Sequence, residues 1–168
     1  AVSLRHFLSE PGEDYRVRVT ERASAALPVP VLLGAMLAAE GVGFVLVGSA
    51  ALWLRGFEVT VGDVDIVADL DAANLQRLCA AVGRSQPLSR RRPSPRSLLA
   101  VDVWSAQTLY GRLDVMVERA RHDLEVLRAG ADAVLVRDVA VSVASARAAW
   151  ELRRRFKPSE DHHGEVGG

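Results

Sequence analysis

Cysteine is almost absent from this chain of 168 residues, since Cys79 is the only one. A single thiol excludes an intramolecular disulfide and a metal site built from several cysteines. Net charge is absent as well, because 21 basic residues balance 21 acidic ones. The overall field therefore gives no argument for attraction to nucleic acid or to a membrane surface. Hydrophobic residues make up 49% and charged residues 25%, which is typical of a folded globular domain.

We also expect no targeting segment and no membrane-spanning segment. Residues 1–10 have no charged start, long apolar stretch or small-residue cleavage site of the kind that a secretory signal carries. Residues 28–54 are long and apolar, with Glu40 as their only charge, but prolines and glycines interrupt the run. We therefore expect a cytoplasmic protein with no membrane partner.

Acidic residues are missing between Asp71 and Asp102, which leaves that interval strongly positive. Its arginines are Arg77, Arg84, Arg90, Arg91, Arg92 and Arg96. Residues 83–97 combine proline, serine and arginine without hydrophobic periodicity, which predicts a flexible loop. A solvated loop is favoured over an RNA- or DNA-binding segment, because no aromatic residues alternate with the arginines. We expect one domain over residues 1–168, with this loop and a disordered tail over residues 159–168.

Apolar runs and turn residues predict alternating helices and strands. Helices are expected over residues 30–40, 50–55, 72–82, 123–128 and 146–156. Strands are expected over residues 44–47, 64–68, 98–104 and 113–117, and within residues 133–143. Ser49 and Ser145 are expected to cap the helices that follow them. This alternation predicts an α/β (α+β) fold with a mixed central sheet and flanking helices.

Two aspartates, Asp63 and Asp65, begin the second predicted strand. Because strand side chains alternate between faces, both carboxylates are expected on one face of the sheet. Two carboxylates held this close repel each other, and Mg²⁺ with its preference for oxygen ligands is the natural cation to join them. A second pair, Asp69 and Asp71, is expected instead to end this strand and to cap the next helix.

Upstream of the acidic pair, a predicted strand ends in Gly48 and Ser49 at the start of a helix. Free backbone N–H groups at a helix start favour a phosphate. Because Gly48 has no side chain, the backbone can approach such a ligand closely. These two residues are our candidates for phosphate binding.

The two motifs together resemble the nucleotidyltransferase superfamily of DNA polymerase beta. Residues 47–51 read Val-Gly-Ser-Ala-Ala and residues 63–67 read Asp-Val-Asp-Ile-Val, similar to the family signature of Gly-Gly or Gly-Ser, a spacer, and Asp-hydrophobic-Asp. The long spacer with Gly56 inside it looks most like the bacterial branch that includes AbiE-type abortive-infection toxins and related uncharacterised nucleotidyltransferases. The resemblance implies the nucleotidyltransferase fold.

The resemblance also implies a third carboxylate. Residues 111–115, Gly-Arg-Leu-Asp-Val, are similar to the later family strand that supplies it, which makes Asp114 the candidate. Asp102 is the alternative, because it too lies between apolar residues. With Asp63 and Asp65, the third carboxylate would hold two Mg²⁺ ions and activate the attacking hydroxyl, while Ser49 would contact phosphate.

Towards the C-terminus, residues 143–161 resemble the closing element of the family. That likeness implies that Arg153 and Lys157 neutralise phosphate charge; the alternative for Lys157 is a solvent-exposed cation at a helix end. One departure stands out, because Val59 and Val61 occupy the region where relatives often carry an arginine and a threonine.

Two functions follow from these residues. The first is a Mg²⁺-dependent nucleotidyltransferase that moves a nucleoside monophosphate from a triphosphate such as ATP to a hydroxyl of tRNA or another RNA, of a protein or of a small molecule. The resemblance to the branch with AbiE-type toxins implies a toxin–antitoxin or phage-defence role, with a cognate toxin or antitoxin as partner. The second is a nucleotidyltransferase fold that has lost catalysis and binds nucleotide, RNA or protein. The intact acidic pair favours the first, and the substituted loop favours the second.

Overall fold

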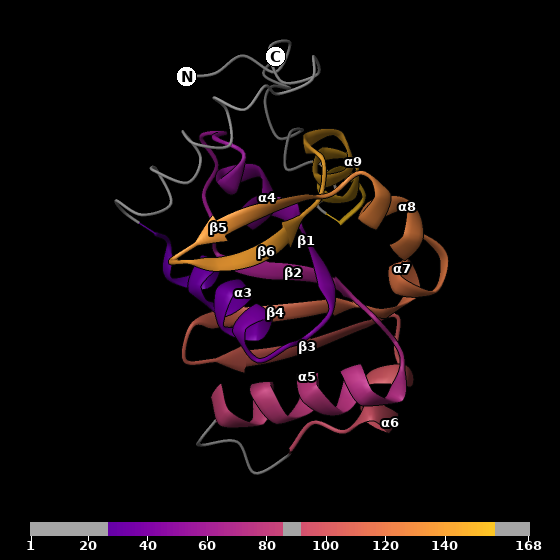
Figure 1. Ribbon diagram of the computed structural model, residues 1–168. Helices are drawn as coiled ribbons and strands as arrows, with labels where there is room; N and C mark the ends of the chain where they lie inside the picture. Colours follow the sequence, from indigo (N-terminus) through magenta and orange to yellow (C-terminus); the bar gives the residue numbers. More distant parts are fainter. Residues whose placement is uncertain (1–26, 86–91, 157–168) are drawn as a thin grey trace, which may run out of the picture.

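The computed structural model describes residues 27–85 and 92–156 of the chain (Figure 1). The helices are α3 (Val29–Ala39), α4 (Gly48–Leu54), α5 (Ala72–Ser85), α6 (Pro95–Leu99), α7 (Val117–His122), α8 (Leu124–Ala129) and α9 (Ala146–Phe156). The strands are β1 (Phe44–Val47), β2 (Asp63–Ala68), β3 (Val103–Thr108), β4 (Gly111–Met116), β5 (Asp132–Val136) and β6 (Val139–Val143). None of the helices in these two ranges has the length and apolar character that crossing a membrane requires.

The strands form one six-stranded sheet in the order β3-β4-β2-β1-β6-β5. Two antiparallel hairpins, β3–β4 and β5–β6, flank the central antiparallel pair β1–β2. Parallel pairing joins each hairpin to the centre, β4 to β2 and β6 to β1. The sheet is therefore mixed and helices lie around it, which confirms the predicted α/β architecture (Figure 1).

Alternation along β1 divides the core between the two faces of the sheet. Phe44 and Leu46 belong to the larger buried cluster, with residues of α3, α4 and α5, whereas Val45 and Val47 belong to a smaller one with residues of α7, α8 and α9. Strand side chains that alternate in this way point to opposite faces. Val67 of β2 lies in the smaller cluster. By the same period of two, the face of β2 that carries Val67 also carries Asp63 and Asp65.

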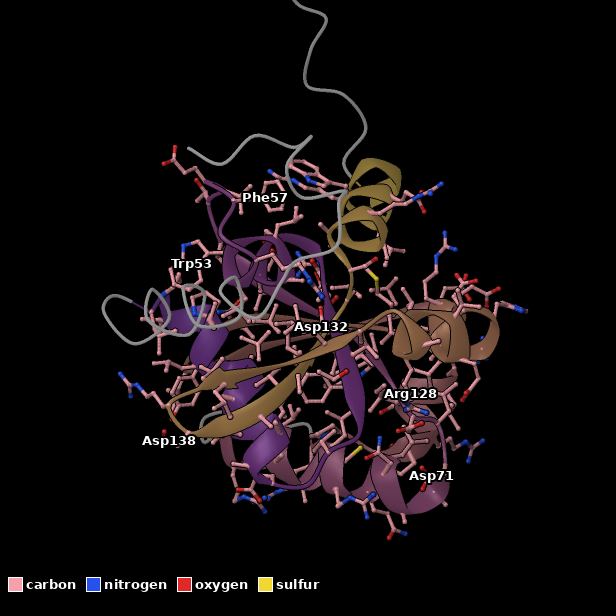
Figure 2. The ribbon with its side chains drawn as sticks, turned by 45° about the horizontal axis from the view of Figure 1, so that its top comes forward. Trp53, Phe57, Asp71, Arg128, Asp132 and Asp138 are labelled. Atoms are coloured by element: carbon pink, nitrogen blue, oxygen red, sulfur yellow. The ribbon has the colours of Figure 1, made fainter. Side chains whose placement is uncertain are left out.

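A buried arginine directly after α4 bonds this helix to the end of β6 and the start of β5. Arg55 is 4% exposed, and its Nε and Nη2 donate to the carbonyl oxygens of Ala144 and Val143 at 2.6 and 3.0 Å. Its Nη1 lies 2.9 Å from the carboxylate of Asp132, at the start of β5 (Figure 2). Arg55 thereby fixes α4 against the point where β6 leads into α9.

Both ends of the predicted loop over residues 83–97 are helical. Helix α5 continues past Gly83 to Ser85, and α6 occupies residues that were expected to be loop and strand. Ser94 and Ser97 form a reciprocal capping box at the start of α6, and Leu98 is fully buried. A capped helix competes here with the apolar pattern of residues 98–104, so the strand starts only at Val103. Residues 86–91 and the tail over 159–168 lie outside the described part.

Other local expectations have mixed outcomes. Asp71 accepts a hydrogen bond from the Asn74 backbone N–H at 2.9 Å at the start of α5, as predicted. Ser145 accepts one from the Ala148 backbone N–H at 3.2 Å, which confirms its cap. The prediction for Ser49 was wrong, because α4 already starts at Gly48 and has no side-chain cap. The helix expected over residues 123–128 is confirmed as α8, and α7 directly before it was not expected.

Candidate active site

Three carboxylates meet on adjacent strands. Asp65 of β2 and Asp114 of β4 are directly paired in the parallel ladder, and Asp63 lies two residues before Asp65 on the same face. One oxygen from each of the three side chains lies within 4.8 Å of the others. Asp114 is buried, whereas Asp63 and Asp65 are partly exposed. Asp63 and Asp65 thus share a face as the sequence predicted, and a carboxylate from a different strand completes the cluster.

Gly48 brings the backbone against this cluster. Val47, the last residue of β1, is paired with Asp65, so the chain turns into α4 directly beside that aspartate. Gly48 has φ +67°, a conformation that L side chains rarely adopt, and a Cβ built on it would clash with the Asp65 carboxylate. Both the turn and the close approach therefore require glycine here. The next residue, Ser49, is 7% exposed and adds its side chain to the same pocket.

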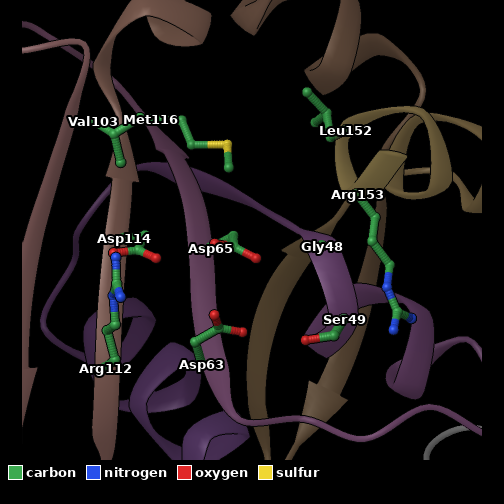
Figure 3. A pocket seen from close by; sticks show the side chains of 10 residues that line it. All are labelled: Gly48, Ser49, Asp63, Asp65, Val103, Arg112, Asp114, Met116, Leu152 and Arg153. Atoms are coloured by element: carbon green, nitrogen blue, oxygen red, sulfur yellow. The ribbon is translucent and has the colours of Figure 1, made fainter. Parts of the chain in front are cut away.

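The pocket has a volume of about 280 Å³ and is lined by both acidic and basic groups. Its lining residues are Gly48, Ser49, Asp63, Asp65, Val103, Arg112, Asp114, Met116, Leu152 and Arg153. In Figure 3 the carboxylates of Asp63 and Asp65 lie between Asp114 on one side and Ser49 on the other. Arg153 reaches in from α9 on the Ser49 side. The pocket thus has an acidic half on β2 and β4 and a second half that carries a hydroxyl and a cation.

Asp114 is held by two donors. Ser105 Oγ on β3 donates to Asp114 Oδ1 at 2.5 Å, and Arg112 Nε donates to the same oxygen at 2.9 Å. The hydrogen bond from Arg112 to Asp114 raises the pKa of the guanidinium, and the charges of Asp114, Asp63 and Asp65 act in the same direction. Arg112 is therefore a permanent positive charge beside three carboxylates.

Of the two basic residues expected at the site, Arg153 lies in the pocket. Arg153 lines the pocket, and its guanidinium carbon lies 5.5 Å from the ring centroid of Trp150, which fits a cation–π contact. Trp150 in turn meets Phe57 edge to face, with 5.9 Å between the ring centroids. This stack orients the arginine from α9. Lys157 lies outside the described residues.

The rival for the third carboxylate, Asp102, lies elsewhere. Its side chain is 81% exposed, and it forms an ion pair with Arg121 Nη1 at 4.0 Å. Asp102 precedes β3 instead of lying within a strand, and it lines a separate hollow with Glu118 and His122. The geometry therefore brings Asp114, and not Asp102, to Asp63 and Asp65.

Two residues of the site, Ser105 and Arg112, were not singled out from the sequence. Arg112 could have been found, because it lies two positions before Asp114 and so shares its face of the strand. Ser105 could not, since its position opposite Asp114 depends on the register of the β3–β4 hairpin. That register is fixed by the turn at Leu109–Tyr110, for which the sequence carries no strong signal.

The donor set suits a hard divalent cation. Three carboxylates supply oxygen ligands only, which is what Mg²⁺ and similar ions prefer, and they converge from rigid strands. Histidine and cysteine, which zinc usually takes as ligands, are absent from the described residues that line this pocket. The residues present therefore fit Mg²⁺ or Mn²⁺.

Comparison with known proteins returned little. No protein-family model and no curated protein matches the sequence. Among solved structures, the chain is similar to a Thermotoga maritima protein that is provisionally assigned as a nucleotidyltransferase. The two chains share 16% sequence identity over 88% of each, with a TM-score of 0.49.

Proposed function

We propose that this chain is a Mg²⁺-dependent nucleotidyltransferase that moves a nucleoside monophosphate from a triphosphate to a hydroxyl acceptor. The observation that carries the proposal is the cluster of Asp63, Asp65 and Asp114 beside the glycine turn at Gly48. Three converging carboxylates are unfavourable without cations, and a pocket that also contains Ser49 and Arg153 offers groups for phosphate. Metal and triphosphate would therefore bind as a unit.

Asp63, Asp65 and Asp114 are the residues that would hold the metal. Bound Mg²⁺ would withdraw charge from the phosphate oxygens and lower the pKa of an attacking hydroxyl, as in two-metal sites. Two ions are proposed when nucleotide is bound, because the resemblance to the nucleotidyltransferase superfamily implies two and the three carboxylates are close enough together to share them.

The two halves of the pocket suggest where each substrate lies. Ser49 and Arg153 would bind the triphosphate, since a hydroxyl donor and a guanidinium complement phosphate oxygens. The acceptor hydroxyl would then approach Asp114 from the opposite side. A bond forms between the acceptor oxygen and the α-phosphorus, the bond from that phosphorus to the pyrophosphate oxygen breaks, and Asp114 receives the hydroxyl proton. Pyrophosphate leaves with the electron pair of the broken bond.

The finer assignments depend on the sequence resemblance. On that ground we propose ATP as the donor. The acceptor would be tRNA or another RNA, a protein or a small molecule. The biological role would be in a toxin–antitoxin or phage-defence system with a cognate partner. A cytoplasmic location accords with a nucleoside triphosphate as substrate. Lys157 is proposed as a second phosphate-binding cation.

One observation favours a second candidate, a nucleotidyltransferase-like domain that binds without catalysis. Val59 and Val61, in the loop before Asp63, pack against the larger hydrophobic cluster instead of presenting polar groups to a ligand. A donor nucleotide would then have fewer contacts on this side. In this alternative the chain binds nucleotide, RNA or protein and releases no pyrophosphate.

Calorimetric titration with ATP, GTP, CTP and UTP, with and without Mg²⁺, tests the proposal. We expect at least one triphosphate to bind in a Mg²⁺-dependent manner, and Asp65→Asn to abolish that binding. Asp138→Asn is the matched control, because Asp138 lies at the exposed tip of the β5–β6 hairpin, away from the pocket (Figure 2).

Three outcomes separate the candidates. Mg²⁺-dependent binding with pyrophosphate release on addition of an acceptor supports the enzyme. Binding of a triphosphate that releases no pyrophosphate when RNA, protein or small-molecule acceptors are added favours the second candidate. Wild-type protein with no Mg²⁺-dependent affinity for any triphosphate would mean that the three carboxylates are not a working metal site.

A further inference from the structure

The third carboxylate of the site is held from the neighbouring strand. Ser105 of β3 is the direct cross-strand partner of Asp114, and its hydroxyl donates to Asp114 Oδ1 at 2.5 Å. Arg112 reaches the same oxygen at 2.9 Å from two residues upstream on β4, and its Nη2 donates to Ser105 Oγ at 3.3 Å. Ser105, Arg112 and Asp114 thus form a closed triangle of hydrogen bonds.

Ser105 and Arg112 both donate to Oδ1 of Asp114, and neither donates to Oδ2. Figure 3 shows one oxygen of Asp114 meeting Arg112 and the second oxygen directed towards Asp65. A carboxylate can rotate about its last torsion, which is broad and imposes little preference of its own. The two bonds to Oδ1 remove that freedom and fix the direction of Oδ2.

We infer that Ser105 and Arg112 are positioning residues, which orient Asp114 so that Oδ2 faces Asp65 and thereby set the affinity of the pocket for a divalent cation. The inference rests on the proposed function, because it assigns a role toward the metal that Asp63, Asp65 and Asp114 would hold. Neither residue is proposed to touch the metal itself.

Exposure argues against a purely structural role for the two donors. Ser105 is exposed and the Arg112 side chain is 57% exposed, so water can replace either donor with little loss of folding free energy. Asp114 is 8% exposed and cannot reorient as freely. What water cannot replace is the fixed direction, and hydrogen bonds from outside a metal's ligands are typically worth about 10–100-fold in metal affinity.

The test uses Mn²⁺ as the probe, in the presence of a nonhydrolysable triphosphate analogue, with bound Mn²⁺ measured by electron paramagnetic resonance. Ser105→Ala removes a donor without changing charge, and we expect it to weaken Mn²⁺ affinity by about 10-fold. Ser105→Thr keeps the hydroxyl on an exposed strand position and should restore most of the affinity. Arg112→Lys keeps the charge but loses the planar fork, and should also weaken binding.

Ser142→Ala provides the matched control, since it makes the same change on β6, at the other side of the sheet. It should leave Mn²⁺ affinity unchanged. Thermal unfolding of the metal-free proteins is measured in parallel, and all four variants should keep the wild-type midpoint. A lower affinity with an unchanged midpoint is a result that a merely structural role would not give.

The failure of this inference is distinguishable from that of the proposed function. Wild-type affinity in Ser105→Ala, with clear Mn²⁺ binding by the wild type, would overturn the positioning role and leave the proposed function standing. Absence of Mn²⁺ binding by the wild type would overturn both. Weakened binding in Ser105→Ala that Ser105→Thr fails to restore would also contradict the inference, because the hydroxyl would not be the group responsible.

Discussion

The backbone of Gly48 lies so close to the carboxylate of Asp65 that no side chain fits between them. The contact joins the end of β1 to the first strand of the acidic cluster, where Val47 and Asp65 are paired. It combines two constraints, the positive φ of Gly48 and the space occupied by Asp65. The turn and the cluster therefore cannot be altered independently.

Gly48→Ala is expected to lower the free energy of unfolding by about 1–3 kcal/mol, because the φ of +67° is strained for alanine and its Cβ would push Asp65 aside. Urea-induced unfolding measures this loss, and Mg²⁺-dependent triphosphate binding should fall with it. Gly62→Ala is the control, since a Cβ there meets nothing within 4 Å. Equal stability of the two variants would contradict the close contact.

Asp65→Asn should leave the metal-free protein as stable as the wild type or more stable, by up to about 1 kcal/mol, because it removes one of three mutually repelling charges. Unfolding in the presence of a chelator is the measurement. Added salt should narrow the difference by screening the remaining charges. A clear loss of stability would instead show that Asp65 has a structural role.

Arg55→Ala is expected to lower the free energy of unfolding by about 3–5 kcal/mol, because it removes a buried guanidinium that bonds two carbonyl oxygens and the Asp132 carboxylate. Arg147→Ala, which removes an exposed partner of Glu151 on α9, should cost less than about 0.5 kcal/mol. Chemical denaturation of both variants checks the contrast. Similar values for the two would mean that the buried network does not fasten α4.

Leu98→Ala should destabilise the fold by about 2–5 kcal/mol, since Leu98 is fully buried in the larger cluster. Leu99→Ala, at the next position and 38% exposed, should have a much smaller effect. Guanidinium unfolding of this pair tests whether α6 packs as described. A deletion in the arginine-rich stretch before α6 would also remove the cap of this helix if it reached Ser94.

Local pattern was sufficient for much of the fold. The apolar runs and the paired aspartates predicted β1, β2 and the face that carries Asp63 and Asp65, because each depends only on neighbours in sequence. Residues 98–104 misled for the same reason, since their apolar pattern competes with a capping box that starts at Ser94. The capping residues are both serines and carry a weaker signal than the usual acidic partner.

Long-range pairing was beyond the sequence. Nothing in the residues themselves says that β4 lies beside β2, so the meeting of Asp114 with Asp65 was expected only from resemblance to a family. The position of Ser105 opposite Asp114 required the correct hairpin register, because a shift of one residue would have placed its side chain on the other face of the sheet. Arg55 gave no signal either, because a charged residue at the end of an apolar helix ordinarily indicates exposure, and here three separate partners offset its burial.

The contribution of α9 to the pocket has a consequence for the order in which the site is built during translation. All three carboxylates are synthesised before Arg153, which follows only after β6, the strand that pairs with β1 in the middle of the sheet. A nascent chain could thus assemble the acidic half first. Arg153, which faces Ser49, arrives last. Under the proposed function, a growing polypeptide would therefore gain its metal-binding residues before its full set of triphosphate-binding residues.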